Sequence, residues 1–306
     1  MKSKLTLRKL RTEQPNPLSA GLDYRSSLEI ARIMNAEDAK VAAAVKQALP
    51  QIASAIDWIE DALRSGGRLI YVGAGTSGRI AALDAAESPP TFDTDPRTVQ
   101  FVIAGGTKAL AAATEVSEDS RELGRRQINK RKPGHHDVVV GIAASGRTPF
   151  TVAAIQEARR KGAKTIAVTC NRNSPLEKAA HMAIVTEVGP EVLAGSSRLK
   201  AGTAQKLVLN MLSTGAMTRL GYVYGNLMVN LRLKNEKLRE RGISIVEQVA
   251  GVSREAARKA LHAGGSVAIT LVMLKARVSR DVAARALRLC RGNVREAITH
   301  AKRGLH

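Results

Sequence analysis

Five short apolar runs, alternating with longer helix-like stretches, constrain the fold of this chain more than any other feature. Each run is rich in β-branched residues and bounded by turn formers, as buried strands are. The runs are Leu69 to Val72, Val99 to Ile103, Val138 to Ile142, Thr165 to Val168 and Ala183 to Thr186. Because parallel strands need long crossover connections, this alternation predicts an α/β fold in three layers, a parallel sheet with helices on both faces.

Helical segments flank the predicted sheet. Ala42 to Leu63 carries an apolar stripe of helical period, and a second long helix is expected from about Ser197 to Leu220. Ser253 and Ser279 stand where helix N-caps would, each before an Ala-rich basic stretch. We therefore expect four parts, which are an N-terminal helical segment (1–58), the sheet domain (59–222), a connecting helical segment (223–251) and a small C-terminal helical bundle (252–306).

The composition is that of a globular chain with a large positive charge. Of the 306 residues, 44% are hydrophobic but only 3% are aromatic, so aliphatic side chains must fill the core. The net charge of +21 first suggests a polyanion such as nucleic acid. We favour a solvated basic face that attracts small anionic substrates, because aromatic residues for base stacking are scarce. No nucleic-acid partner is expected.

Neither a membrane nor a metal is indicated by the sequence. No apolar run approaches the length of a membrane span, and the basic N-terminus has no apolar stretch behind it, which predicts a cytoplasmic protein. Cys170 and Cys290 lie far apart without a CxxC pattern and are expected to be reduced, buried thiols. His135 and His136 lack a third ligand at suitable spacing, so we interpret them as loop residues.

The first strand runs into a glycine-rich loop that indicates phosphate binding. The loop matches the G-x-G-x-x-G spacing of dinucleotide-binding folds, but no acidic residue follows the second strand, where Ile103 leads into Ala104. Hydroxyls between the glycines favour a cradle for a phosphate monoester, built from main-chain N–H groups, hydroxyls and a helix N-terminus. The candidate binding residues are Gly75, Thr76, Ser77, Gly78 and Arg79.

A second loop of the same design follows the third strand. It again joins a strand, a Ser-Gly-Arg turn and a helix that opens near Pro149. Because ligands of parallel sheets bind beyond the carboxyl ends of the strands, both loops are expected at one edge. Arg79 and Arg147 remain open between substrate contact and a surface or ion-pair role. The candidate binding residues of the second loop are Ser145, Gly146, Arg147 and Thr148.

A third hydroxyl-rich segment opens the long predicted helix. Its candidate binding residues are Ser196, Ser197 and Lys200. The segment either adds donors at the same edge, or supplies an ordinary Ser N-cap followed by a solvated face of Lys and Arg. The sequence leaves both interpretations open.

Long blocks of this chain resemble one family. The blocks are TEQPNPLSAGLD, GGRLIYVGAGTSGRIAALDAAESPPTF, DVVVGIAASGRTPF and VGPEVLAGSSRLKAGTAQKLVLNMLSTGAM. They are similar to the N-acetylmuramic acid 6-phosphate etherases, which have the flavodoxin-like sugar isomerase domain. The resemblance implies a homodimeric lyase of cell-wall amino-sugar recycling, which forms N-acetylglucosamine 6-phosphate and D-lactate without a metal or cofactor.

The same resemblance implies the catalytic residues. The family's proton donor to the ether oxygen falls on Glu87, and its second carboxylate, the base at C2, falls on Glu118. Two carboxylates suffice for β-elimination of lactate followed by hydration, provided that their environments hold them in opposite protonation states. Without the resemblance, each Glu would be interpreted as a solvated helix residue.

Two other functions fit the same predicted fold. A ketose–aldose isomerase for hexose phosphates would also use a Glu base, but would not need both Glu87 and Glu118. A phosphosugar-sensing regulator would control a kinase or a promoter. The N-terminal helices lack the short spacing of a helix-turn-helix, and kinase-binding regulators usually carry two phosphosugar domains where this chain has length for one.

Overall fold

The chain folds into two compact units in the computed structural model, which describes residues 11–112, 115–233 and 235–304. The first unit comprises Met1–Ala85 and Arg97–Ser213, and the second comprises Ala86–Pro96 and Thr214–His306. In the described part of the chain, no helix is long and apolar enough to cross a membrane.

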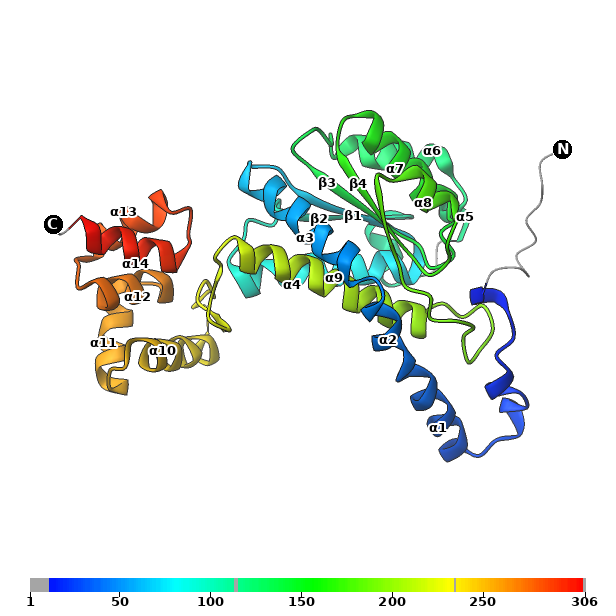
Figure 1. Ribbon diagram of the computed structural model, residues 1–306, viewed down its shortest axis with the longest axis horizontal. Helices are drawn as coiled ribbons and strands as arrows, with labels where there is room; N and C mark the ends of the chain where they lie inside the picture. The colour runs from blue at the N-terminus through cyan, green and yellow to red at the C-terminus, as the bar shows by residue number, and fades with distance from the viewer. Residues whose placement is uncertain (1–10, 113–114, 234, 305–306) are drawn as a thin grey trace. The chain divides into compact units, whose positions relative to one another are not determined.

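The first unit is built on a five-stranded parallel sheet (Figure 1). The strands are β1 (Leu69–Gly73), β2 (Val99–Ile103), β3 (Val138–Ile142), β4 (Lys164–Thr169) and β5 (Met182–Val185). They lie in the order β2-β1-β3-β4-β5, which is that of flavodoxin-like folds. The predicted fold class is therefore confirmed, and each predicted run is a strand to within one residue at either end.

Helices precede, separate and follow these strands. They are α1 (Ser27–Asp38), α2 (Lys40–Lys46), α3 (Leu49–Arg64), α4 (Gly75–Phe92), α5 (Glu115–Glu118), α6 (Arg121–Lys130), α7 (Pro149–Arg160), α8 (Pro175–Ala179) and α9 (Lys200–Arg219). Short 3₁₀ turns precede α1 at Arg11–Glu13, Pro17–Ser19 and Leu22–Tyr24, and another follows β2 at Gly106–Leu110. Both α4 and α9 begin in the first unit and end in the second.

Side chains of successive strand residues point to opposite faces, and helices cover both (Figure 1). Ile70 and Val72 of β1 belong to an apolar cluster with Phe150 of α7. Tyr71, between them, faces the opposite side, where its hydroxyl donates to Asp84 of α4 at 2.8 Å. The three predicted layers are thus α6, α7 and α8, the sheet, and α3, α4 and α9.

Two predicted helices begin or end elsewhere than expected. The stripe from Ala42 to Leu63 belongs to two helices, α2 and α3. Pro50 lies in the first turn of α3, where its missing N–H is tolerated, whereas inside one continuous helix it would remove a hydrogen bond. The long helix α9 begins at Lys200 and not at Ser197.

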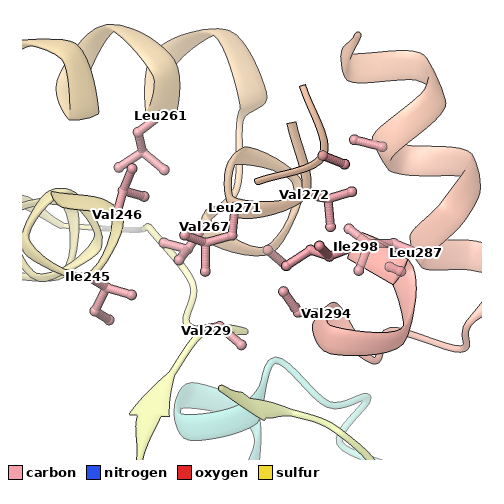
Figure 2. Close-up of a cluster of buried hydrophobic side chains, with 14 of the residues drawn as sticks. Val229, Ile245, Val246, Leu261, Val267, Leu271, Val272, Leu287, Val294 and Ile298 are labelled. Carbon is pink, nitrogen blue, oxygen red and sulfur yellow. The ribbon is translucent and has the colours of Figure 1, made fainter. Parts of the chain in front are cut away.

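The second unit is a helical bundle with a small hairpin. The hairpin pairs β6 (Val223–Tyr224) with β7 (Leu227–Met228), and the helices are α10 (Glu236–Ala250), α11 (Arg254–Gly264), α12 (Val267–Ala276), α13 (Arg280–Leu289) and α14 (Val294–Arg303). Figure 2 shows their shared core, in which Val229 and Val246 lie in one cluster with Leu271 and Ile298. This core includes residues on both sides of the predicted boundary at residue 252, and the four-part division stays a prediction.

The predicted N-caps of this bundle are confirmed. The hydroxyl of Ser253 accepts from the N–H of Ala256, and that of Ser279 accepts from the N–H of Val282. Capping of this kind satisfies a main-chain donor in the first helical turn.

The two cysteines differ in burial. Both are free, and burial raises the pKa of the Cys170 thiol to about 12. Cys290 is only partly buried, so the prediction of two buried thiols is wrong for this residue.

Candidate active site

The carboxyl ends of β1 and β3 form the switch point of the sheet. These strands are neighbours, with Gly73 opposite Ile142. The chain leaves β1 toward β2 on one side and leaves β3 toward β4 on the other. Ligands of open α/β sheets bind where the strand order reverses in this way. The loops that follow β1 and β3 therefore lie at one edge of the sheet, as the sequence predicted.

The loop after β1 turns directly into α4. Its glycines are required by packing, because a Cβ on Gly73 would lie 2.8 Å from the nitrogen of Gly78, and one on Gly78 would lie 2.5 Å from Cγ1 of Ile103. The N–H of Gly78 donates to the carbonyl oxygen of Ala74 at 3.1 Å, the first hydrogen bond within the helix. The N–H groups of residues 75–77 precede it, and such helix-terminal donors suit an anion.

The two hydroxyls of this loop lie close to α9. Ser77 is 8% exposed, and its hydroxyl donates to Oε1 of Gln205 at 3.0 Å. Thr76 is partly buried, and its Cγ2 would lie 3.5 Å from a Cβ on Gly202. The N-terminal turns of α4 and α9 thus meet at these side chains.

The side chain of Arg79 contacts the segment after β2. Its guanidinium donates to the main-chain carbonyl oxygens of Ala109 at 3.0 Å, Leu110 at 3.2 Å and Ala112 at 2.9 Å. The sequence left open whether Arg79 contacts the substrate or has a surface or ion-pair role. These contacts favour neither, because they make Arg79 a structural brace that binds the main chain.

The loop after β3 makes a left-handed turn before its helix. Gly146 has φ +66°, and a Cβ there would lie 2.4 Å from Oγ of Ser174, so only glycine fits. The hydroxyl of Ser145 accepts from the N–H of Arg147 at 3.2 Å. Thr148 is the N-cap of α7. Ser145, Arg147 and Thr148 are all partly buried at this edge.

A carboxylate, and not a serine, caps α9. Both oxygens of Glu191 accept main-chain N–H groups, from Lys200 at 3.0 Å and from Ala201 at 2.9 Å. Burial raises the pKa of Glu191, in opposition to these two hydrogen bonds. Ser196 and Ser197 are partly buried in the loop before the helix, so the interpretation of this segment as an ordinary Ser N-cap is wrong.

The amine of Lys200 lies in a buried ion pair. It contacts the carboxylate of Glu37, and the two side chains are 1% and 2% exposed. Lys40 also pairs with Glu37, and Nδ2 of Asn16 donates to it at 2.9 Å. Burial raises the pKa of Glu37, but the hydrogen bonds from Lys200, Lys40 and Asn16 outweigh it and lower the pKa to about 2. The predicted solvated face is wrong for Lys200, whose amine is held by a carboxylate within the protein.

The two predicted catalytic carboxylates lie on different elements. Glu118 ends α5 and is partly buried. Gly75 has φ +51°, and a Cβ on it would lie 3.0 Å from Oε1 of Glu118, so this carboxylate lies over the first turn of α4. Glu87 lies in the part of α4 that belongs to the second unit, and it is exposed.

Four residues at this edge escaped the sequence interpretation. Asn16, Glu191 and Gln205 lie within the blocks that resemble the etherases, so those blocks were the available signal. Glu37 lies in an ordinary polar stretch of α1 and gave no local signal. In the part of the chain that the structure describes, no group of three or more His, Cys, Asp or Glu residues is placed to hold a metal ion.

Known protein families match segments of both units of the chain. Family models match residues 51–159 as the glucokinase regulatory protein N-terminal SIS domain, residues 134–215 as the SIS domain, and residues 225–291 as the C-terminal lid domain of glucokinase regulatory protein. The N-acetylmuramic acid 6-phosphate etherase of Symbiobacterium thermophilum is 56% identical over 276 residues, which are 90% of this chain and 91% of that protein. The chain belongs to the N-acetylmuramic acid 6-phosphate etherase family.

Other relatives support this family and fold. The etherase of Clostridium beijerinckii is 47% identical over 295 residues, which are 96% of this chain and 97% of that protein. The solved structure of a phosphoheptose isomerase from Francisella tularensis has a TM-score of 0.50 at 19% identity, and covers 63% of this chain and 100% of its own. The two etherases confirm the predicted family resemblance. The isomerase structure supports only the fold.

Proposed function

We propose that the protein cleaves the lactyl ether of N-acetylmuramic acid 6-phosphate with water, giving N-acetylglucosamine 6-phosphate and D-lactate in cell-wall amino-sugar recycling. The observation that carries this proposal is the 56% identity to an etherase over nine tenths of both chains. Two phosphate-type loops at the switch point support it independently, because they suit a sugar phosphate.

The substrate phosphate is assigned to the first turn of α4. Main-chain N–H groups of Gly75, Thr76 and Ser77 would donate to it, and the loop from Ser145 to Thr148 faces the same edge. Hydroxyls and helix-terminal N–H groups donate hydrogen bonds to the phosphate dianion and so stabilise its charge without protonating it. The +21 net charge would also attract such a substrate.

The reaction needs one base and one acid. Glu118 would remove the proton at C2 of the opened sugar, next to the C1 aldehyde. Electrons of that C–H bond form the C2–C3 double bond as the C3–O bond breaks, and Glu87 gives its proton to the leaving oxygen, which departs as D-lactate. Water then adds across the double bond, with its hydroxyl at C3 and a proton at C2. The position of Glu118 beside Gly75 supports its part in this scheme.

The test of the reaction is D-lactate release from N-acetylmuramic acid 6-phosphate by the purified protein, with a chelator and without any cofactor. Stoichiometric formation of D-lactate and N-acetylglucosamine 6-phosphate is expected. Tight binding of the sugar phosphate without lactate release would contradict the etherase and favour a sensor or an isomerase. Interconversion of hexose phosphates in the same preparation would identify the isomerase.

The roles of the carboxylates are tested by separate substitutions. Glu87→Gln is expected to abolish lactate release while exchange of the C2 proton with solvent persists, because the base at C2 is intact. Glu118→Gln is expected to abolish both. Glu122→Gln, an exposed site on α6, is the matched control and should retain full activity. Loss of both signals in Glu87→Gln would contradict this division of roles.

We further propose that the protein works as a homodimer in the cytoplasm, where a charged sugar phosphate is retained. Three large apolar side chains in and before α1 are exposed, Leu18 at 62%, Tyr24 at 89% and Leu28 at 58%. A second copy of the chain would cover them. Light scattering should give twice the chain mass. Tyr24→Ser with Leu28→Ser should reduce it to one chain, whereas Leu289→Ser, at a side chain that is also 62% exposed, should not.

A further inference from the structure

A buried amide beside the phosphate loop has an unpaired donor. Gln205 is 1% exposed, and its Oε1 accepts the hydroxyl hydrogen of Ser77. Among the described residues, its Nε2 has no hydrogen-bond partner. An unpaired buried N–H group costs about 1–3 kcal/mol, and such groups are rare in proteins. This arrangement therefore calls for a partner or for another orientation of the amide.

Rotation of the carboxamide by half a turn exchanges its nitrogen and oxygen in the same space. Nε2 would then donate to the Ser77 oxygen, which keeps the 3.0 Å contact. The unpaired group would become a carbonyl oxygen, which is tolerated better than an unpaired N–H. The hydroxyl hydrogen of Ser77 would be released from Gln205 and free to rotate.

The released hydrogen has one obvious use at this place in the fold. Ser77 lies in the first turn of α4, beside the N–H groups that suit an anion. A hydroxyl that accepts from Gln205 can donate only to another group. The Glu118 carboxylate lies over the same turn, and when the sugar phosphate is bound, a phosphate oxygen at the helix terminus becomes the nearest acceptor for the Ser77 hydroxyl.

We infer that Gln205 is a positioning residue for the phosphate monoester: its amide donates to Ser77 and thereby aims the Ser77 hydroxyl at the bound phosphate. This inference rests on the proposed function, because it takes the sugar phosphate as the ligand of α4. Gln205 itself lies behind Ser77 and does not touch the substrate.

The inference is tested by binding of N-acetylglucosamine 6-phosphate, measured by titration calorimetry, which is independent of turnover. Ser77→Ala is expected to weaken binding about tenfold, as for one hydrogen bond to a charged group. Gln205→Leu should weaken it about threefold to tenfold, because the hydroxyl is no longer held in one direction. Combined with Ser77→Ala, Gln205→Leu should add nothing, since it acts through that hydroxyl.

A second variant preserves the shape of the side chain. In Gln205→Glu the carboxylate can only accept, so it would capture the Ser77 hydrogen, and binding should weaken at least as much as in Ser77→Ala. Gln51→Glu, an exposed site on α3, makes the same change of charge and should bind normally. Melting temperatures of all variants separate loss of folding from loss of binding.

Kinetics give a further readout that a purely structural role would not produce. In Gln205→Leu the KM for N-acetylmuramic acid 6-phosphate should rise more than kcat falls, as for loss of ground-state binding. Normal affinity in both Gln205 variants, or an equal loss with and without Ser77→Ala, would overturn the inference alone. Failure of the unmodified protein to bind any sugar phosphate would overturn both the inference and the proposed function.

Discussion

The loops after β1 and β3 share the tripeptide Ser-Gly-Arg but not its conformation. After β1, Gly78 lies within the first turn of α4 and packs on Ile103. After β3, Gly146 is left-handed at φ +66° and packs on Ser174 before α7 begins. The same three residues thus form a helical turn in one loop and a left-handed turn in the other. A short motif such as Ser-Gly-Arg therefore indicates which groups are available for binding, whereas the residues packed around it determine its backbone conformation.

The side chains of the two loops also differ in what they contact. Ser77 and Arg79 reach other elements, the amide of Gln205 and the main chain after β2. Ser145 instead accepts an N–H from within its own loop. Other elements contact the second loop through its main chain, because the carbonyl oxygens of Ala144 and Gly146 accept from Nδ2 of Asn171 at 3.0 Å and from the N–H of Leu176 at 2.9 Å.

The largest expected effect lies at α9, whose start supports the first loop. Lys200→Met should lower the free energy of unfolding by about 3 kcal/mol, the lower end for a broken buried pair, because Glu37 loses its buried partner while Lys40 and Asn16 still contact it. Urea unfolding measures the change. Lys178→Met, on α8, is the control and should differ little. A loss below about 1 kcal/mol would show that the ion pair does not hold this region.

The next effect tests the left-handed turn of the second loop. Gly146→Ala should lower the free energy of unfolding by about 3 kcal/mol, because a positive φ is unfavourable for alanine and its Cβ would meet Ser174. Gly189→Ala, with φ +73° and open space, should lose about 1 kcal/mol, which isolates the backbone contribution. Equal losses at both positions would mean that the contact with Ser174 is unimportant.

The corresponding change in the first loop should depend on a side chain. Gly78→Ala places a Cβ 2.5 Å from Cγ1 of Ile103, and the overpacking should lower stability by about 2 kcal/mol. In an Ile103→Ala background the added loss should largely vanish, as a double-mutant cycle would measure. The same loss in both backgrounds would contradict the contrast between the loops.

Arg79 should affect stability by a smaller amount. Arg79→Met removes the donors to three main-chain carbonyl oxygens and should lower the free energy of unfolding by about 1 kcal/mol. Hydrogen exchange of residues 106–112 should rise in the same variant. Unchanged exchange together with a higher KM would favour a substrate contact instead.

Acid should reveal the pairing of Glu37, whose contribution to stability is fully present at neutral pH. Its pKa falls from 4.5 to about 2 on folding, so it stabilises the protein above the higher value and this contribution is lost as pH falls through about 2. The hydrogen bond from Arg160 lowers the pKa of Glu157 to about 2 as well, so Glu37 and Glu157 lose their contributions to stability over the same range of acid pH. Stability of Glu37→Gln should therefore depend less on acid pH than that of the unmodified protein. An unchanged slope would contradict the lowered pKa.

Much of the sheet could be predicted from the sequence, because strand identity is largely local. Runs such as Val138 to Ile142 must be buried on both faces, and buried parallel strands have little tolerance for polar residues. The glycine spacing likewise indicated where each strand gives way to a loop. Serine N-caps such as Ser253 act within one helical turn, so their signal is also local.

Tertiary structure alone decided which polar groups meet. Glu37 and Lys200 are 163 residues apart, and Ser77 and Gln205 are 128 residues apart, so no local pattern records either contact. The amine of Lys200 is drawn to a buried carboxylate because an unpaired charge in the interior is costly. The sequence by itself determined the layers and the loops, and it predicted a phosphate site at them; the packing of α1 and α9 decided which polar side chains are paired within the protein.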